Sequence, residues 1–409
     1  MTNTAGDLET TSTASPPAAA PARGGLLATL GVAAAGLLVL LGLAQLHGRP
    51  ATFGIAVLAA VLGVAAFSGR LVLPATPLLR HLLIAVVGGL LAFVFADHVG
   101  AFTAFEIAQV AFYLPAVAGL NLLTGHNGQL SLGHGALMAV GAYTGAVMMT
   151  HQPHVPIIVL FAGAVVVSTL AGAIVGVAAA RLRGPYLAGA TLTLAVAAPE
   201  LATRYRTILG GEQGLPLRPL NPPGWLSTNF GLERWMAFVG IACCLVVLVV
   251  LANLMRSGTG RRFRTVRDDE TAASLVGTNV ARTQVLAFVV SAACAGLAGA
   301  LYALANGLAS PAAFSLTLSF GLLTAIVVGG IGTLAGSIWG AAALVYIPHL
   351  TNNVAKHYQL SASVKGNLPL AIYGFVLVAA MLVFPEGIQG GLRRLGGAIP
   401  GLRPRRAGA

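Results

Sequence analysis

The sequence predicts an all-α polytopic membrane protein, and three observations lead to that prediction. First, 57% of the 409 residues are hydrophobic and only 8% are charged, whereas a soluble domain carries about 25% charged residues. Second, the apolar residues fall in runs of about 20, the length of helix that crosses a bilayer core. Third, arginines gather in short loops and in the C-terminal tail, as the positive-inside rule expects.

The runs indicate roughly 10–12 membrane segments, some of them broken or re-entrant. They are expected near 26–46, 51–67, 81–96, 107–123, 130–149, 155–180, 186–203, 235–255, 285–307, 320–350 and 368–384. Residues 1–24 have the composition of a disordered tail and lack the basic start of a signal peptide. We therefore expect the divisions 1–24 (tail), 25–104 (N-terminal segments), 105–390 (core, with a loop at 256–284) and 391–409 (basic tail).

The loop arginines also predict an orientation. The loop is rich in arginine and should be cytoplasmic; its arginines are Arg256, Arg261, Arg262, Arg264, Arg267 and Arg282. The basic C-terminal tail should lie on the same side, and counting back through the runs places the N-terminus there too. Three single crossings after the loop would put the tail outside, so 320–350 should form a hairpin or broken pair. Its glycines Gly329, Gly330 and Gly332 supply the break.

A second stretch, 119–147, combines membrane location with polar residues and glycines. Gly125 and Gly128 are expected to break a helix there. Buried polar groups are costly unless they face protein or water. One interpretation is a broken helix that lines a translocation path, and the other is ordinary small-residue packing with a turn. The candidate path residues, here and in the later segment 186–203, are Asn121, Gln129, Ser131, Thr191 and Thr193.

The loop stretch 268–277 predicts a short helix that faces the cytoplasm. Asp268 or Asp269 can cap its start, and Gly277 is placed to end it. The helix offers a small, partly apolar knob that fits a groove on a soluble partner. The alternative is a solvated loop with an incidental helix. The candidate docking residues are Asp268, Asp269, Glu270, Ala272, Ala273, Leu275, Val276 and Gly277.

The sequence contains no motif that is typical of nucleotide binding, enzymatic catalysis or metal binding. The chain has two lysines, Lys356 and Lys365, and neither lies in a phosphate-binding G-x-x-x-x-G-K-[ST] pattern. No protease, hydrolase or metal-ligand spacing occurs either, which argues against a membrane enzyme. The three cysteines lie in apolar runs and are expected to pack as small apolar residues. Glu200 precedes Arg204 by four residues, so an ion pair is expected.

Several motifs together resemble the permease subunits of branched-chain amino acid ABC importers of the LivM type, over roughly 105–390. The motifs are GLNLLTGHNGQLSLGHGALMAVGAYTGA at 119–146, RLRGPYL at 181–187, ILGGEQGL at 208–215, the stretch 264–303, VVGGIGTLAGSIWGAAALV at 327–345 and FPEGIQG at 384–390. The sequence departs from the family at one acid, which would fall near Val196 but here is Glu200. Residues 1 to about 100 match only loosely.

The resemblance implies an ABC importer permease fold in the cell membrane. It also implies a second related permease, two cytoplasmic ATPases and an external solute-binding protein as partners, with the lipid bilayer and no nucleic acid. ATP and Mg²⁺ would be bound by the ATPases and no cofactor by this chain. The stretch 268–277 would be the coupling helix that docks on an ATPase.

Two alternatives remain open at this point. The same importer architecture carries other solutes, such as urea, an amide or a sugar. An ion-coupled secondary transporter is the other alternative, although such proteins usually place an acid at the membrane midplane.

Overall fold

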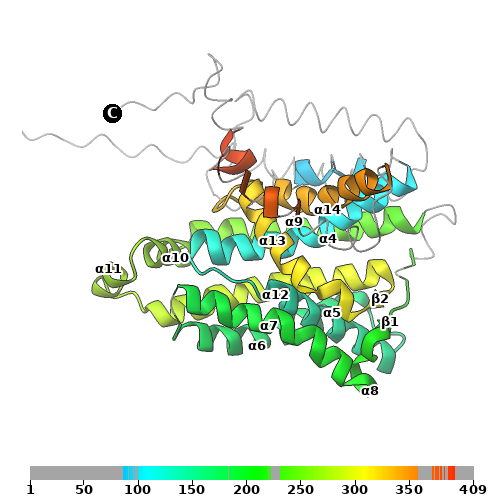
Figure 1. Ribbon diagram of the computed structural model, residues 1–409, viewed down its shortest axis with the longest axis horizontal. Coiled ribbons are helices and arrows are strands. Elements are labelled where there is room, and N and C mark those ends of the chain that lie inside the picture. Colours follow the sequence, from blue (N-terminus) through cyan, green and yellow to red (C-terminus); the bar gives the residue numbers. More distant parts are fainter. Residues whose placement is uncertain are drawn as a thin grey trace, which may run out of the picture.

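The computed structural model is a bundle of long helices (Figure 1). It describes residues 100–357, apart from 183, 220 and 223–230, and short helical pieces within 86–96 and 371–391. Among these residues, five helices are long and apolar enough to cross a membrane. The bundle has two ends: α10 and α11 project from one, and α8, β1 and β2 cover the other (Figure 1). We refer to them as the α11 end and the β end.

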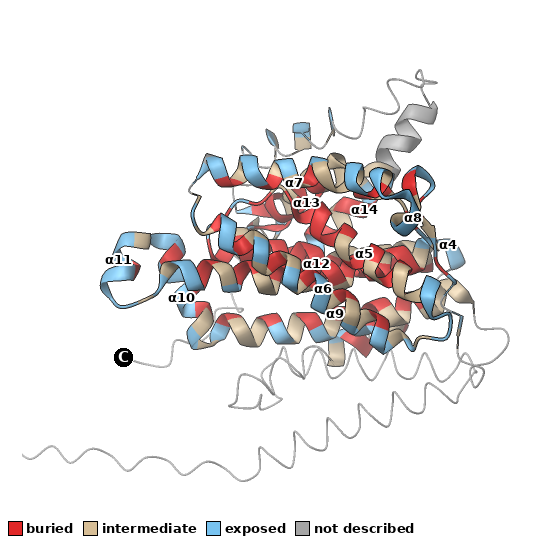
Figure 2. Cartoon of the chain, turned by 90° about the horizontal axis from the view of Figure 1, so that it is seen from below, coloured by how far each residue is buried: buried red, intermediate tan, exposed pale blue. Residues whose placement is uncertain are grey.

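Helix α12 (Val280–Asn306) runs through the middle of the bundle and contacts α4 (Ala101–Leu120), α5 (His134–His151) and α6 (Ile157–Ala179) most extensively. Figure 2 shows it as a largely buried central rod. Small residues allow this proximity, because a Cβ added at Gly141 would overlap the backbone of Gly296, and one at Gly299 would overlap that of Met138. Close backbone approach at glycine is a common way for membrane helices to pack.

Helix α4 continues into a π-helix, η1 (Asn121–His126), at the α11 end. Residues 127–133 then turn back into the bundle, with Gly128 at a φ of +78°. Gly133 lies against the Thr191 carbonyl and Gly135 against the Ser319 hydroxyl, so α5 begins inside the protein. The predicted break in 119–147 is therefore present at Gly128, whereas the prediction for Gly125 is wrong, because that residue lies within η1.

Helix α6 returns to the α11 end, and α7 (Pro185–Arg204) leads back to the β end. There the chain forms α8 (Arg206–Leu209), η2 (Gly211–Gln213) and the strand β1 (Leu215–Pro216). β1 pairs antiparallel with β2 (Leu308–Ala309), with Leu215 opposite Ala309. η3 (Pro311–Phe314) follows β2. These short elements join the ends of α7 and α12.

Helix α9 (Leu232–Arg256) packs on α4 and leads into α10 (Gly258–Asp268) and α11 (Glu270–Leu275). Mainly apolar residues of α10 face the bundle, because Phe263 and Val266 are buried while its arginines are exposed. The elements α10 and α11 therefore form a ledge and a protruding tip at one end of the molecule (Figure 1).

The predicted hairpin in 320–350 is confirmed. Helix α13 (Leu316–Gly329) ends at a break, and α14 (Leu334–His357) begins after it. A Cβ added at Gly340 would meet the Ala325 carbonyl, and one at Gly329 would meet the Gly336 carbonyl, so the two helices pack antiparallel. Gly330 and Gly332 have φ of +119° and +76°, a backbone that other residues adopt at a cost.

The other expected segments of the core agree with α4 to α7, α9 and α12 to within a few residues. Only pieces of the segments near 81–96 and 368–384 are described, and those pieces are helical. Several expected parts lie outside the described residues: the tail at 1–24, the segments near 26–46 and 51–67, and the tail at 391–409 except for Gly391.

Candidate functional site

Asn121 joins η1 to the glycine break between α13 and α14. Its side-chain amide donates to the Thr333 carbonyl at 2.8 Å and to the Ser337 hydroxyl at 3.1 Å, and its oxygen accepts from the Gly332 amide at 2.7 Å. The side chain is buried, at 1% exposure. One asparagine therefore satisfies backbone groups that the break leaves without helical partners. We name the contact region of η1 with 329–333 the glycine junction.

Gly125 brings the two parts of the glycine junction into direct contact. A Cβ added there would lie 2.8 Å from the Gly332 Cα and 2.5 Å from the Asn121 side-chain oxygen. On the other side of the break, an added Cβ at Gly330 would lie 2.9 Å from the Glu386 carbonyl. Residues 386–390 of the 384–390 motif thus reach the α11 end, where they pack on the junction. Glycine is required at 125 and 330, because any larger residue would overlap the neighbouring chain.

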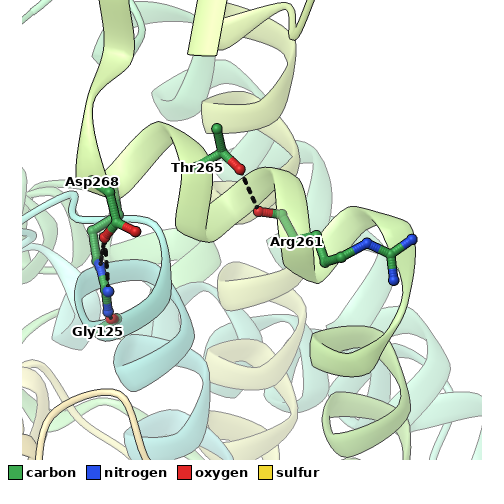
Figure 3. A network of polar contacts seen from close by, with 5 residues as sticks. Gly125, Arg261, Thr265 and Asp268 are labelled. Atoms are coloured by element: carbon green, nitrogen blue, oxygen red, sulfur yellow. Dashed lines mark hydrogen bonds and ion pairs between the residues drawn. The ribbon is translucent and has the colours of Figure 1, made fainter. Parts of the chain in front are cut away.

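Arg267, near the end of α10, connects the protruding loop to this junction. Its guanidinium donates one hydrogen bond of 2.9 Å to the Gly125 carbonyl and two, of 3.0 and 2.8 Å, to the Asp268 carboxylate (Figure 3). The carbonyl lies at the C-terminal end of η1, where a cation is favourable. The planar guanidinium can hold both partners at once.

The predicted path residues divide into four that are buried and one that is exposed. Asn121 lies in the junction. Gln129 accepts from the Asn127 amide at 2.9 Å, and Ser131 accepts from the Gly133 amide at 3.4 Å. Thr191 accepts from the Leu132 amide at 3.0 Å and so holds the re-entrant segment against α7. Thr193, also on α7, is exposed on the outside of the bundle.

An apolar cavity of about 400 Å³ separates part of α5 from α7 toward the β end. Its lining is Ala136, Ala139, Val140, Tyr143, Thr144, Val147, Met148, Ala198, Leu201, Ala202 and Leu209. The Thr144 hydroxyl is bonded to the Val140 carbonyl, whereas the Tyr143 hydroxyl has no hydrogen-bond partner among the described residues. The cavity is open to the surface, because its lining residue Leu201 is exposed.

Helix α11 has the caps that its sequence predicts. The Asp269 carboxylate accepts from the amides of Thr271 and Ala272 at 2.7 and 3.0 Å. At the other end, Gly277 has a φ of +79°, and the Thr278 amide bonds to the Ala273 carbonyl in a Schellman arrangement.

The tip of α11 presents apolar side chains outward. Leu275 is 84% exposed and Val276 is 75% exposed, whereas Ala273 is buried against the bundle. The remaining docking candidates, Asp268, Asp269 and Ala272, are exposed on the same loop, and Glu270 accepts from the Gln284 side chain at 2.8 Å. The loop therefore offers a small apolar tip at the end of α11, with three acids at the start of the helix.

Two smaller predictions have different outcomes. The cysteines are free, and two of them, Cys244 and Cys294, are buried among apolar residues as expected. The predicted ion pair of Glu200 with Arg204 is wrong, because no such pair forms. Both side chains are exposed, and exposed charges gain little from pairing. Within the described part of the chain, no group of acids, histidines or cysteines could hold a metal ion.

The contact of Arg267 with Gly125 could not be predicted from the sequence. Arg267 is one of several arginines in the loop, and its partner Gly125 lies 142 positions away in the chain. The adjacent Asp268 is the one available signal, because a neighbouring carboxylate can hold a guanidinium in place.

These features define a class of protein: a multi-pass membrane permease with a protruding loop at one end and broken helices inside. The family model for the branched-chain amino acid transport system permease component matches residues 102–384. The chain belongs to this family and is a multi-pass inner-membrane protein.

Its relatives include both permeases of one type of transport system. The high-affinity branched-chain amino acid transport system permease LivM of Salmonella typhimurium is 31% identical over 297 residues, covering 68% of this chain and 67% of the relative. The corresponding LivH protein is 27% identical, covering 68% and 91%. The autoinducer 2 import system permease LsrC of an Enterobacter species is 30% identical, covering 59% and 68%. No solved structure matches the chain.

Proposed function

We propose that this chain is the membrane subunit of an ATP-driven importer of branched-chain, apolar amino acids. The relatives named for that transport support the solute class. The observation that carries the proposal is the exposed apolar tip of α11 on a chain that has no phosphate-binding motif. A transporter without a nucleotide pocket must receive the energy of ATP through a contact surface, and this tip has the form of one.

The α11 end is the cytoplasmic end in this proposal. The exposed arginines of α10 lie there, as the positive-inside rule requires. The N- and C-termini face the same side, and the β end faces outward. The partners are a second related permease, two ATPases that bind ATP and Mg²⁺, and an external solute-binding protein. This chain binds no cofactor and catalyses no reaction of its own.

Transport then proceeds by alternating access. The binding protein delivers the solute at the β end, and the ATPases move α11 as they bind and hydrolyse ATP. Arg267 passes that movement to η1, and Gly125 passes it to the hairpin of α13 and α14. The route consists of one side-chain hydrogen bond, from Arg267 to Gly125, and a close packing of Gly125 on Gly332, so a displacement of one element should displace the next.

The first experiment changes Leu275 and Val276 together to Asp. Two charges on the apolar tip should remove the ATPase from the purified complex and abolish leucine uptake by proteoliposomes. The matched control is Ile208→Asp, an exposed position on α8 at the opposite end, which should keep the ATPase bound. Normal co-purification of the ATPase with the double variant would remove the docking assignment.

The same proteoliposomes test the energy source and the solute. Uptake should require ATP on the ATPase side, and leucine, isoleucine and valine should compete with one another. Uptake that runs on an ion gradient without ATPase would establish a secondary transporter. Competition by urea, an amide or a sugar, with none by leucine, would keep the architecture and change the solute.

A further inference from the structure

The end of α9 and the start of α10 form a corner at the α11 end of the bundle. Helix α9 has 25 residues and is therefore about 37 Å long. The apolar core of a bilayer is about 30 Å thick, so the ends of α9 reach the headgroup layers. Its exposed residues Val246 and Val250 are apolar, as a surface against lipid tails must be. The last residue of α9, the exposed Arg256, therefore lies at the level of the lipid headgroups.

Helix α10 is held at the same level. A Cβ added at Gly260 would overlap the backbone of Met255, so the first turn of α10 packs against the last turn of α9. Phe263 and Val266 then fix α10 on the bundle, because both side chains are buried. The exposed arginines at the start of α10 are thereby kept beside the end of α9.

Two arginines of this corner have no partner for their charge. The side chains of Arg261 and Arg262 are exposed, and neither makes a hydrogen bond or an ion pair with another residue that the structure describes. Arg267 differs, because Asp268 neutralises it. The Arg261 side chain extends away from the glycine junction (Figure 3), and one of its nitrogens lies 3.9 Å from a Cβ added at Gly258, the first residue of α10. The start of a helix carries a partial positive charge, so an anion is needed there to offset this guanidinium.

We propose that Arg261 and Arg262, with Arg256 beside them, bind the phosphate group of an anionic phospholipid in the leaflet at the α11 end. A guanidinium can donate two parallel hydrogen bonds to phosphate oxygens. Basic clusters directly beyond a membrane helix attract anionic lipids, and each residue raises the affinity about fivefold. The acyl chains of the lipid lie along the apolar exposed residues of α9, which lead to this corner.

The position of the corner favours a lipid over an acidic surface of a protein partner. The corner adjoins α9, whose exposed side faces lipid tails, whereas the tip of α11 projects beyond it (Figure 1). Helix α10 has no acid before its last residue, Asp268, so the corner itself is uniformly basic. This lipid site depends on neither the ATPase nor the solute of the proposed function, and it can be tested without them.

Lipid binding by the purified full chain in mild detergent tests the proposal. The probe is phosphatidylglycerol with a fluorophore on one acyl chain, and its anisotropy reports binding. Changing Arg261 and Arg262 together to Gln should weaken binding at least about tenfold. The matched control changes Arg204 and Arg206 to Gln, which removes the same charge from exposed positions toward the β end and should keep the native affinity. Size-exclusion chromatography checks that both variants elute as the native chain does.

Competition identifies the source of the phosphate. Unlabelled phosphatidylglycerol should displace the probe, whereas zwitterionic phosphatidylethanolamine and glycerol 3-phosphate, which has no lipid tails, should not. Equal weakening in the two double variants would overturn the proposal, because it would show attraction by net charge alone. Displacement by glycerol 3-phosphate would overturn the lipid as the ligand. Unchanged lipid affinity of the Arg261 and Arg262 variant, with loss of the ATPase from its complex, would assign the corner to a protein partner instead.

Discussion

At the scale of single residues, Arg267 joins the protruding loop of α10 and α11 to η1, while Glu270 of the same loop accepts a hydrogen bond from Gln284 of α12. Its guanidinium bridges Asp268 on the loop and Gly125 in η1. Other arginines of the loop do not share this arrangement: the Arg261 side chain extends away from Gly125 (Figure 3). Arg267 is thus the arginine of this loop whose side chain makes a defined contact with η1.

Replacement of Arg267 by Ala should uncouple transport from ATP hydrolysis. The lost hydrogen bond to Gly125 is worth on the order of 1 kcal/mol at this half-exposed position, so the subunit should still fold and bind the ATPase. Solute transported per ATP hydrolysed should fall severalfold, with an intermediate value for Arg267→Lys, which lacks the planar fork. Arg261→Ala is the control. An unchanged ratio for Arg267→Ala would show that movement takes another route.

The residue scale also shows the limit of sequence reasoning. Asp269 and Gly277 were predictable as caps, because capping depends on residue type at fixed local spacing. Asn121 was recognised as polar and embedded, but its role in holding Gly332 and Thr333 depends on a contact across 211 positions or more. The residue pattern around Asn121 contains no information on contacts with such distant parts of the chain.

At the scale of elements, α11 is a helix too short to be stable alone. It is six residues long, so its shape depends on the Asp269 cap, the Gly277 turn and the burial of Ala273. These contacts keep Leu275 and Val276 in a fixed position at the tip. The local contacts of α11 therefore hold the exposed side chains of Leu275 and Val276 in place.

Replacement of Asp269 by Ala should fray α11, because loss of such a cap costs about 1 kcal/mol. The affinity of the complex for the ATPase should fall, and a titration of the ATPase against reconstituted permease measures it. Asp269→Ser is the informative partner variant, since serine also caps. If Asp269→Ser behaved like Asp269→Ala, the carboxylate charge rather than the cap would be what matters.

Broken elements were predictable only in part. The hairpin of α13 and α14 followed from three facts: segment length, a glycine cluster and the requirement that two basic segments share one side. The re-entrant segment 127–133 and the π-helix η1 could be expected only as a break of unspecified form. Their geometry is set by contacts with Thr191 and Arg267, which belong to distant parts of the chain.

At the scale of the whole molecule, α12 supports the other helices through contacts between backbones. Gly141→Leu should prevent α5 from packing on α12, because its side chain would meet the Gly296 backbone, which cannot rotate away. Size-exclusion chromatography of the isolated chain in mild detergent should show aggregated or missing protein. Gly189→Leu is the control, since nothing lies within 4 Å of an added Cβ there, and it should elute as the native chain does. Identical profiles would contradict this account of the core.

The glycine junction also bears on how such a transporter can diversify. Beside the Asn121 side chain, its close approaches are made by the main chain of Gly125, Gly330 and Gly332, so a larger residue at one of these glycines would meet backbone atoms that cannot rotate away. The glycines of the recognisable motifs are therefore required by the packing of the subunit. The open side of α7 has no such restriction. Nothing lies within 4 Å of a Cβ added at Gly189, so single substitutions can accumulate there while the junction stays unchanged.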